Sequence, residues 1–342
     1  MRPARALITA AALAVALVPA AAGPAAADPA VSAVGLLPGT TRTLPLGINA
    51  LGVVVGQASD PERSIYRAAR WLPGGWAVEL LRLPGETEAV ANAINRSGVA
   101  VGSSGEHAVR WNSAGTPTGL AGLAGYSDVY ATAINGGGVI VGDAWDRSTG
   151  DRRGVRWSPG GALTVLPPLP GDVSSSVESI SESGVAVGSS RDSSFRERPV
   201  RWAPDGSVRA LPGPTDAEGR ARDINSYGVI VGQLTTSDGS QRPVRWNLDG
   251  SVTDLPLLPG GGPLGAALEL NDRGAIAGLA QQADGGYAPV RWGVDGSLTV
   301  LPPLTGAVSH GWVYDLNEAG TVVGTSGDYL FGPGVRWTFP TK

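Results

Sequence analysis

The residues that could carry out chemistry are few in this chain and lie far apart. Its 342 residues include no Cys and only two His, His107 and His310. No His, Asp and Glu residues cluster at the spacing of a metal site. No Gly-x-Ser-x-Gly turn presents a nucleophilic Ser, since "GSSGE" at Gly102 is one residue short. The sequence therefore predicts no cofactor, no metal ligands and no recognisable set of catalytic residues.

The carboxylates of the chain make an enzymatic function an alternative hypothesis. The chain has 30 Asp and Glu residues. Four of them fall in segments that could approach the centre of the repeat structure described below: Glu86, Asp128, Asp172 and Glu178. Two carboxylates at a suitable separation hydrolyse glycosidic bonds. One hypothesis is accordingly an extracellular hydrolase or lyase that acts on a glycan or an ester.

Aromatic side chains that occur once in the chain point to binding instead. Exposed Tyr and Trp rings stack on sugars or anchor protein interfaces, although such rings also become buried as packing. We expect Trp145 to lie in a loop within a repeat unit and the other candidates to lie in links between units. The ligand-binding candidates are Tyr126, Tyr130, Trp145, His310, Trp312 and Tyr314.

A repeat of about 45 residues positions these side chains. The phrase Asn-x-x-Gly-x-x-x-Gly starts at six Asn residues and, in a seventh copy, at Ser181: Asn49, Asn95, Asn135, Asn225, Asn271 and Asn317. An Arg-Trp pair follows each copy, and the repeated Trp residues are Trp71, Trp111, Trp157, Trp202, Trp246, Trp292 and Trp337. A side chain used seven times at one place indicates architecture, so we interpret these Trp as packing between units.

Each unit contains four short segments typical of strands. The first ends in Ile-Asn, as at residues 93–95, and a tight turn from Asn to Gly leads to the second, as at residues 99–101. The third is Val-Arg-Trp, and a turn such as Asp249-Gly250 leads to the fourth. No helical periodicity is sustained after residue 27. Four strands in a unit of this length are typical of a β-propeller blade.

The two ends of the chain predict a closed ring rather than an open solenoid. The last unit stops after its third strand at Trp337, and residues 31–39 match the missing fourth strand. Pairing the two would leave no unprotected sheet edge. We therefore predict an all-β fold, a seven-bladed β-propeller of four-stranded antiparallel blades, in which the N-terminal strand completes the C-terminal blade.

The two faces of such a disc differ. The turns between the first and second strands, and between the third and fourth, are short and nearly identical; we call their side the uniform face. The loops between the second and third strands and the links between blades vary in length; their side is the variable face. Because binding residues tend to lie on variable loops over a rigid scaffold, we expect a ligand on the variable face.

The units resemble the HAF repeat family, a group of predicted extracellular bacterial repeat proteins. The resemblance rests on His107-Ala108-Val109-Arg110-Trp111 together with the Ala-Ile-Asn and Val-Gly phrases, and it covers nearly all of the chain after residue 27. The other six units lack the His. The resemblance implies an exported, propeller-like repeat protein, and it implies no activity.

The N-terminus predicts export. Arg2 and Arg5 precede an apolar run that ends in small residues, which is the pattern of a secretory signal peptide cleaved after Ala27. The predicted organisation is a signal peptide over residues 1–27 and a single propeller domain over residues 28–342. We expect the mature protein to be extracellular and monomeric, with no membrane span.

The charge pattern excludes one class of partner. The formal net charge is −4, and the basic residues are scattered instead of forming the stripe that nucleic acid requires. The favoured hypothesis is a secreted propeller that binds a glycan, an envelope component or another protein on its variable face. The enzyme described above and a purely structural surface module are the alternatives.

Overall fold

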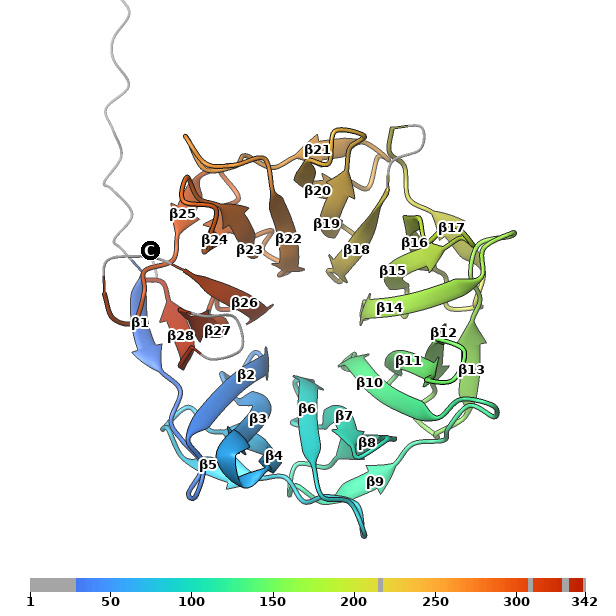
Figure 1. Ribbon diagram of the computed structural model, residues 1–342, viewed down its shortest axis with the longest axis vertical. Helices are drawn as coiled ribbons and strands as arrows, with labels where there is room; N and C mark the ends of the chain where they lie inside the picture. Colours follow the sequence, from blue (N-terminus) through green and yellow to red (C-terminus); the bar gives the residue numbers. More distant parts are fainter. Residues whose placement is uncertain (1–28, 215–217, 307–309, 328–331, 341–342) are drawn as a thin grey trace, which may run out of the picture.

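The chain folds into a ring of seven four-stranded antiparallel sheets around a common axis (Figure 1), which confirms the predicted seven-bladed propeller. The structure is a computed structural model that describes residues 29–214, 218–306, 310–327 and 332–340. The predicted signal peptide lies outside these residues. Within the described ranges, the only helical element is the 3-10 turn η1 (Pro61–Arg63), and no helix is long and apolar enough to cross a membrane.

The innermost strand of each blade is the segment that ends at the repeated Ile-Asn or Leu-Asn (Figure 1). From blade 1 to blade 7 these strands are β2 (Arg42–Ile48), β6 (Ala89–Ile94), β10 (Asp128–Ile134), β14 (Ser174–Ile180), β18 (Glu218–Ile224), β22 (Gly265–Leu270) and β26 (Gly311–Leu316). The second strands are β3 (Val54–Asp60), β7 (Ala100–Ser104), β11 (Ile140–Asp146), β15 (Ala186–Arg191), β19 (Ile230–Thr235), β23 (Ile276–Gln281) and β27 (Val322–Ser326).

The Arg-Trp phrase ends the third strand of each blade. The third strands are β4 (Ile65–Trp71), β8 (His107–Trp111), β12 (Asp151–Trp157), β16 (Glu197–Trp202), β20 (Gln241–Trp246), β24 (Tyr287–Trp292) and β28 (Gly334–Thr338). The outermost strands are short, and in blade 7 this place is taken by the N-terminal strand: β5 (Ala77–Glu79), β9 (Pro117–Gly119), β13 (Leu163–Leu166), β17 (Val208–Ala210), β21 (Val252–Asp254), β25 (Leu298–Val300) and β1 (Ala30–Ala33).

The N-terminal strand closes the ring as the sequence predicts. Strand β1 pairs antiparallel with β28, with Ala30 opposite Thr338 and Ala33 opposite Val335. The pairing continues past the strand, since the Val34 amide donates to the Gly334 carbonyl at 2.8 Å. Blade 7 therefore has four strands and its outer strand comes from the other end of the chain (Figure 1).

Two glycines recur in every unit for two different physical reasons. The first, as at Gly52, has a φ of +76° at the end of the Asn turn, a conformation that favours Gly. The second, as at Gly56, lies opposite a bulge in the inner strand, and a Cβ there would come within 2.0 Å of the Leu44 carbonyl oxygen. The same register shift occurs in all seven inner strands, so the second Gly allows each bulge to form.

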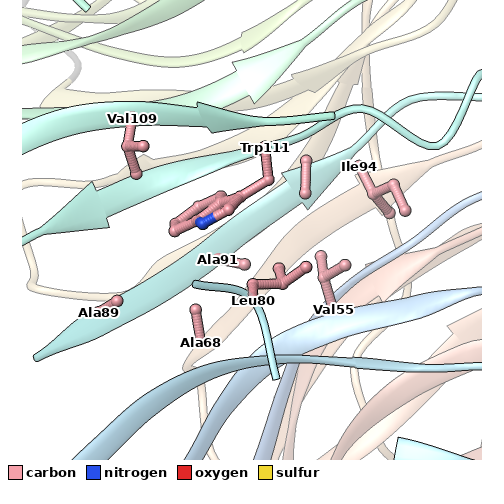
Figure 2. Close-up of a cluster of buried hydrophobic side chains, with 9 residues drawn as sticks. Val55, Ala68, Leu80, Ala89, Ala91, Ile94, Val109 and Trp111 are labelled. Atoms are coloured by element: carbon pink, nitrogen blue, oxygen red, sulfur yellow. The ribbon is translucent and has the colours of Figure 1, made fainter. Parts of the chain in front are cut away.

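The core is divided into seven clusters, each formed mainly between two neighbouring blades. Figure 2 shows one of them, in which Trp111 of blade 2 lies near Leu80 and Val55 of blade 1. The Trp111 indole Nε1 donates to the Leu81 carbonyl at 2.6 Å, and each of the other six repeated Trp makes the equivalent bond to the link leaving the preceding blade. Each Trp thus packs between two neighbouring blades and also hydrogen-bonds them to each other.

A belt of hydrogen bonds joins the blades at the uniform face. Each repeated Asn accepts backbone N–H groups of its own turn through Oδ1, as Asn95 does from Ser97 and Val99. Its Nδ2 donates to the carbonyl of the corresponding residue in the next blade, as from Asn95 to Asn135 at 3.2 Å. Six such bonds run around the ring, the last from Asn317 to Asn49.

The belt is interrupted at one junction, between blades 4 and 5, where Ser181 replaces Asn. The Ser181 hydroxyl bonds within its own turn to Ser183 and Val185. Charged and polar side chains connect the two blades instead. Glu178 lies 3.3 Å from Arg222, the Ser179 hydroxyl donates to Asp223 at 2.7 Å, and Glu197 accepts from Arg220.

Candidate functional site

Three of the six ligand-binding candidates gather in blade 3, and two of them are occupied by internal contacts. The Tyr126 hydroxyl donates to Asp151 at 2.7 Å, and burial together with this bond raises the pKa of Tyr126 to about 12. Arg152 donates to the Tyr130 hydroxyl at 2.5 Å and to Asp143 at 2.6 Å. Only Trp145 presents a large open surface, with 42% of the residue exposed.

The other three candidates lie in blade 7, on or next to the inner strand β26. His310 precedes the strand, and its Nε2 lies 3.0 Å from Asp284 of blade 6. The Trp312 ring meets the Tyr287 ring edge to face, with the centroids 6.5 Å apart at 64°. Tyr314 lies two residues further along β26 and lines the central cavity described below. Blade 7 therefore carries aromatic and polar groups from the variable face into the centre.

The expected positions of four candidates in loops and links were wrong. Tyr130, Trp312 and Tyr314 lie inside inner strands, and Trp145 lies inside the second strand β11. The inner strands begin earlier than the Ile-Asn phrase suggests, because backbone pairing continues toward the variable face; Asp128 still pairs with Trp145. The loop of blade 3 is likewise short, because Asp146 pairs directly with Asp151.

The four carboxylates considered for catalysis do not form one site. Glu86 lies 3.1 Å from the His107 Nδ1, Asp128 pairs with Arg147, and Asp172 pairs with Arg198. Glu178 is the one member that lines the central cavity, and there it pairs with Arg222 at 3.3 Å.

A cavity of about 240 Å³ lies where the seven inner strands meet, and its accessible lining is mainly polar. Blades 1 to 3 contribute Leu46, Ile48, Asn92, Ala93, Ile94, Thr132, Ala133 and Ile134, and the three Ile side chains among them pack in the cores between blades. Blades 4 to 7 contribute a continuous set of polar side chains, which we call the acidic arc: Glu178, Arg222, Asp223, Glu269, Tyr314 and Asp315. The arc holds four carboxylates and a single guanidinium.

Two members of the acidic arc are anchored by backbone groups across blade junctions. Asp223 accepts the Leu270 amide of the next blade at 2.8 Å. Asp315 accepts the Ile48 amide of blade 1 at 2.6 Å, so it acts at the junction where the ring closes. Burial raises the pKa of both carboxyl groups, that of Asp315 to about 7. Amide hydrogen bonds favour the ionised form and oppose this effect.

Glu269 occupies the corresponding place between these two residues and has no such anchor. It makes no hydrogen bond or ion pair with any residue in the described ranges. The residue borders the cavity and is partly buried. Burial first, and then the nearby charges of Asp223 and Asp315, raise its pKa well above the ordinary value.

Asp223, Glu269 and Asp315 were not predicted as site residues, although the sequence contained a signal. All three stand two residues before the repeated Asn, where the first four units have Gly47, Ala93, Ala133 and Ser179. An acidic residue at this position in three successive units is a departure from the repeat. This position lines the cavity only because the strand that contains it is the innermost of its blade.

The uniform face also carries side chains that the sequence reading passed over. Trp76 lies in the turn before β5 and is 76% exposed, more than Trp145. Leu51 and Leu72 of the same blade are exposed as well. The two faces therefore differ in loop length, whereas exposed apolar groups occur on both.

A second hollow, of about 310 Å³, lies away from the axis between blades 4 and 5 and includes Asp192, Arg196, Arg198 and Leu211. Its arginines are already paired, Arg198 with Asp172 and Arg196 with Glu218. The central cavity is the better candidate site because its carboxylates outnumber their cationic partners.

The fold defines a seven-bladed propeller, and comparisons with solved structures agree. The chain is similar to a streptogramin B lyase at 12% identity and a TM-score of 0.60, over 92% of this chain and 98% of that chain. It is also similar to a catalytically inactive histidine-to-alanine variant of virginiamycin B lyase from Staphylococcus aureus with quinupristin, at 12% identity and a TM-score of 0.62, over 92% and 100%.

A third similar structure is a puromycin-hydrolyzing peptidase from Mycobacterium tuberculosis, at 16% identity and a TM-score of 0.57. The likeness covers 88% of this chain and spans about half, 52%, of that chain. No family model and no curated protein sequence matches the chain. At these identities the likeness shows the fold alone.

Proposed function

We propose that this protein is an extracellular binding module that recognises a glycan, free or carried by the cell envelope, on the variable face at the junction of blades 6 and 7. The observation that carries the proposal is the edge-to-face pair of Tyr287 and Trp312 beside the His310–Asp284 pair. An aromatic surface stacks on the apolar face of a sugar ring, and an adjacent carboxylate and imidazole bond to its hydroxyl groups. The extracellular location rests on the predicted signal peptide and on the resemblance to HAF repeats.

A glycan is favoured over a protein partner because the aromatic group is small and adjoins polar side chains. A stable protein interface needs roughly 800 Å² per partner and a buried apolar centre. The Tyr287–Trp312 pair adjoins the exposed Asp284–His310 pair. This combination suits one or two sugar residues.

Glycan-array binding followed by titration of a hit tests the proposal. Trp312→Ala should weaken binding by about tenfold, which corresponds to roughly 1.4 kcal/mol. Trp145→Ala is the matched control, because it removes a more exposed Trp from blade 3. Binding to no glycan, or equal binding by wild type and Trp312→Ala, contradicts the proposal.

An enzyme remains the second candidate function, and one observation favours it. The Asp315 carboxyl has a pKa of about 7 and borders a cavity, so it could exchange a proton near neutral pH. The fold neighbours include a lyase and a hydrolase. Incubation with quinupristin and with puromycin, analysed by mass spectrometry, tests this directly. Turnover that is lost in Asp315→Asn would favour the enzyme, and unchanged compounds favour the binding module.

A further inference from the structure

We propose that the protein docks on an anionic lipid surface through one corner of the uniform face, with the side chains of Leu51 and Trp76 entering the headgroup region. The glycan site proposed above lies on the opposite, variable face, and neither proposal depends on the other. A protein docked in this way would turn its variable face away from the lipid. The proposal starts from a group of exposed apolar side chains at blade 1.

Five exposed apolar residues lie together where blade 1 meets the uniform face, and we call them the blade 1 corner: Leu36, Leu51, Leu72, Pro73 and Trp76. A Cβ on Gly52 would lie 3.8 Å from the Pro73 ring, so the turn that holds Leu51 touches the turn over residues 72–76. A Cβ on Gly35 would lie 3.6 Å from the Gly75 carbonyl oxygen, so the link that holds Leu36 borders the same turn. The corner is therefore one continuous surface.

The side chains of the corner are exposed to an unusual degree for apolar groups. Trp76 is 76% exposed, Leu51 70% and Leu36 56%. Single apolar side chains on a surface are ordinary, whereas several that adjoin one another mark an interaction surface. The corner therefore needs a partner that covers apolar groups.

Carboxylates divide the uniform face into two halves. In blades 4 to 7 its turns carry six: Glu182, Asp205, Asp249, Asp272, Asp295 and Glu318. The corresponding turns of blades 1 to 3, which are neighbours in the ring (Figure 1), carry none, and Arg96 of blade 2 is exposed there. Glu318 of blade 7 accepts the Asp272 amide and so reaches toward blade 6, away from blade 1. The corner thus lies in the half of the face that does not repel an anionic surface.

Two guanidinium groups beside the corner have no carboxylate partner among the described residues. Arg336 of blade 7 donates to the Gly52 carbonyl at 3.2 Å, and Arg70 of blade 1 donates to backbone carbonyls of blade 2. Burial alone lowers the pKa of both groups, whereas at the same place in blade 6 the charge of Asp295 opposes the effect of burial on the pKa of Arg291. Anionic headgroups would offset the positive charge at blade 1.

The size and shape of the corner favour a lipid surface over a protein. A specific protein interface takes roughly 20–30 residues from each partner, whereas the corner consists of two turns and a link. A bilayer accepts such a small projecting group, because Trp is favoured at the headgroup level and Leu gains by burying its apolar surface. Arg side chains nearby add attraction to anionic lipid.

Flotation with lipid vesicles tests the proposal. The experiment uses the chain from residue 28 onward, because the apolar run over residues 6–22 would itself bind lipid; this chain keeps every strand of the seven blades. Vesicles of equimolar phosphatidylglycerol and phosphatidylcholine should bind at least tenfold more strongly than vesicles of phosphatidylcholine alone. Joint Leu51→Ser and Trp76→Ser should weaken binding to the mixed vesicles at least tenfold.

Blade 5 offers a matched control in the acidic half of the same face. Tyr227 takes the place of Leu51 in the Asn turn, and Tyr227 and Leu248 are 67% and 69% exposed. Joint Tyr227→Ser and Leu248→Ser should therefore bind the mixed vesicles as wild type does. Circular dichroism establishes whether both double variants fold.

Quenching by brominated lipid keeps the proposal testable with conservative variants if the Ser variants do not fold. The seven repeated Trp are buried, so quenching should come mainly from a ring that enters the headgroup region. Trp fluorescence of the wild type should fall on mixed vesicles that contain brominated phosphatidylglycerol. Trp76→Phe should remove most of this fall, and Trp145→Phe should keep it.

Several results would overturn the proposal: no binding to the mixed vesicles, equal binding to both kinds of vesicle, unchanged binding by a folded Leu51→Ser and Trp76→Ser variant, an equal loss in the blade 5 control, or quenching unchanged in Trp76→Phe. Self-association without lipid that the blade 1 double variant abolishes would also overturn it, because the corner would then belong to a second copy of the chain.

Discussion

Six of the seven junctions between neighbouring blades share one neutral hydrogen bond, and the junction between blades 4 and 5 does not. At the six, an Asn amide reaches the next blade's backbone carbonyl. At the exception, Ser181 is too short, and Glu178 and Glu197 instead meet Arg222 and Arg220. Polar bonds therefore connect the two blades at every junction, but the groups that form these bonds differ between junctions.

The junction between blades 4 and 5 also lies where the polar side chains around the central cavity begin. Glu178 and Arg222, which join blades 4 and 5, belong to the acidic arc, and the carboxylates of Asp223, Glu269 and Asp315 follow in the next three blades. Blades 1 to 3 carry Gly47, Ala93 and Ala133 at the position of these carboxylates. Asp223, Glu269 and Asp315 form no ion pair with another described residue, so the comparison directs attention to the cavity.

The largest expected effect comes from opening the ring at the closing blade instead of at a belt junction. Deleting residues 30–37 removes strand β1, the buried Val34 and Leu37, and the carbonyl of Gly35 that accepts the Trp71 indole. Burying two such side chains contributes roughly 1.5–3 kcal/mol each, so we expect a loss on the order of 5 kcal/mol. Urea denaturation measures it, and an unchanged midpoint would contradict closure by β1.

The next effect compares the belt with its exception. Asn95→Ala removes the bond to Asn135 and leaves two turn amides without an acceptor, which should cost about 3 kcal/mol at roughly 1 kcal/mol per group. Ser181→Ala removes only bonds within one turn and should cost about 1 kcal/mol on the same basis. Equal midpoints in urea for the two variants would show that the belt contributes no more than a turn does.

A pH effect should come from Asp315, whose carboxylate joins blades 7 and 1 beside the neutral Asn317 bond. Asp315 has a pKa of about 7 in the folded protein, whereas in the unfolded chain it loses its proton near pH 4. Between these values the folded state binds the extra proton, so stability should fall by on the order of 2 kcal/mol as the pH rises from 5 to 8. Urea midpoints at both pH values test this. Asp315→Asn should flatten the dependence, and a slope unchanged by the substitution would assign it to other groups.

The smallest expected effect comes from repairing the belt. Ser181→Asn places an amide where it can reach the Asn225 carbonyl, as in the other six units, and should stabilise the protein by about 1 kcal/mol. The variant should also depend less on salt, because the ion pairs of this junction then matter less. Thermal denaturation at 0.05 and 0.5 M NaCl, with wild type as the control, measures both. A destabilised variant would show that Ser181 is required by its surroundings.

The fold was predictable because its determinants are repeated. Each of the seven units repeats three features at the same offsets: the positive φ at Gly52, the bulge that needs Gly56, and the buried Trp71. Seven copies make such a pattern recognisable even though each single copy is a weak signal. Closure was predictable from the missing fourth strand at the C-terminus.

The candidate site was only partly predictable because it consists of exceptions to that pattern. Tyr314 was identified because an aromatic ring in an unusual place is conspicuous, although its strand was not. Glu269 was overlooked because the sequence alone gives no role to the position two residues before the repeated Asn. Its meaning depends on the axial position of the inner strand and on the two neighbours across blade junctions, which only the folded ring brings together.

The belt of Asn side chains has a consequence for how such a chain could grow. Each Asn supplies the donor for the following unit and, through its own carbonyl, the acceptor for the preceding one. A duplicated gene segment of one unit would therefore encode a complete connector on both sides, and no existing unit would need a compensating change. Gain or loss of a whole unit would therefore leave these hydrogen bonds in place, so the belt does not by itself determine that the ring has seven blades.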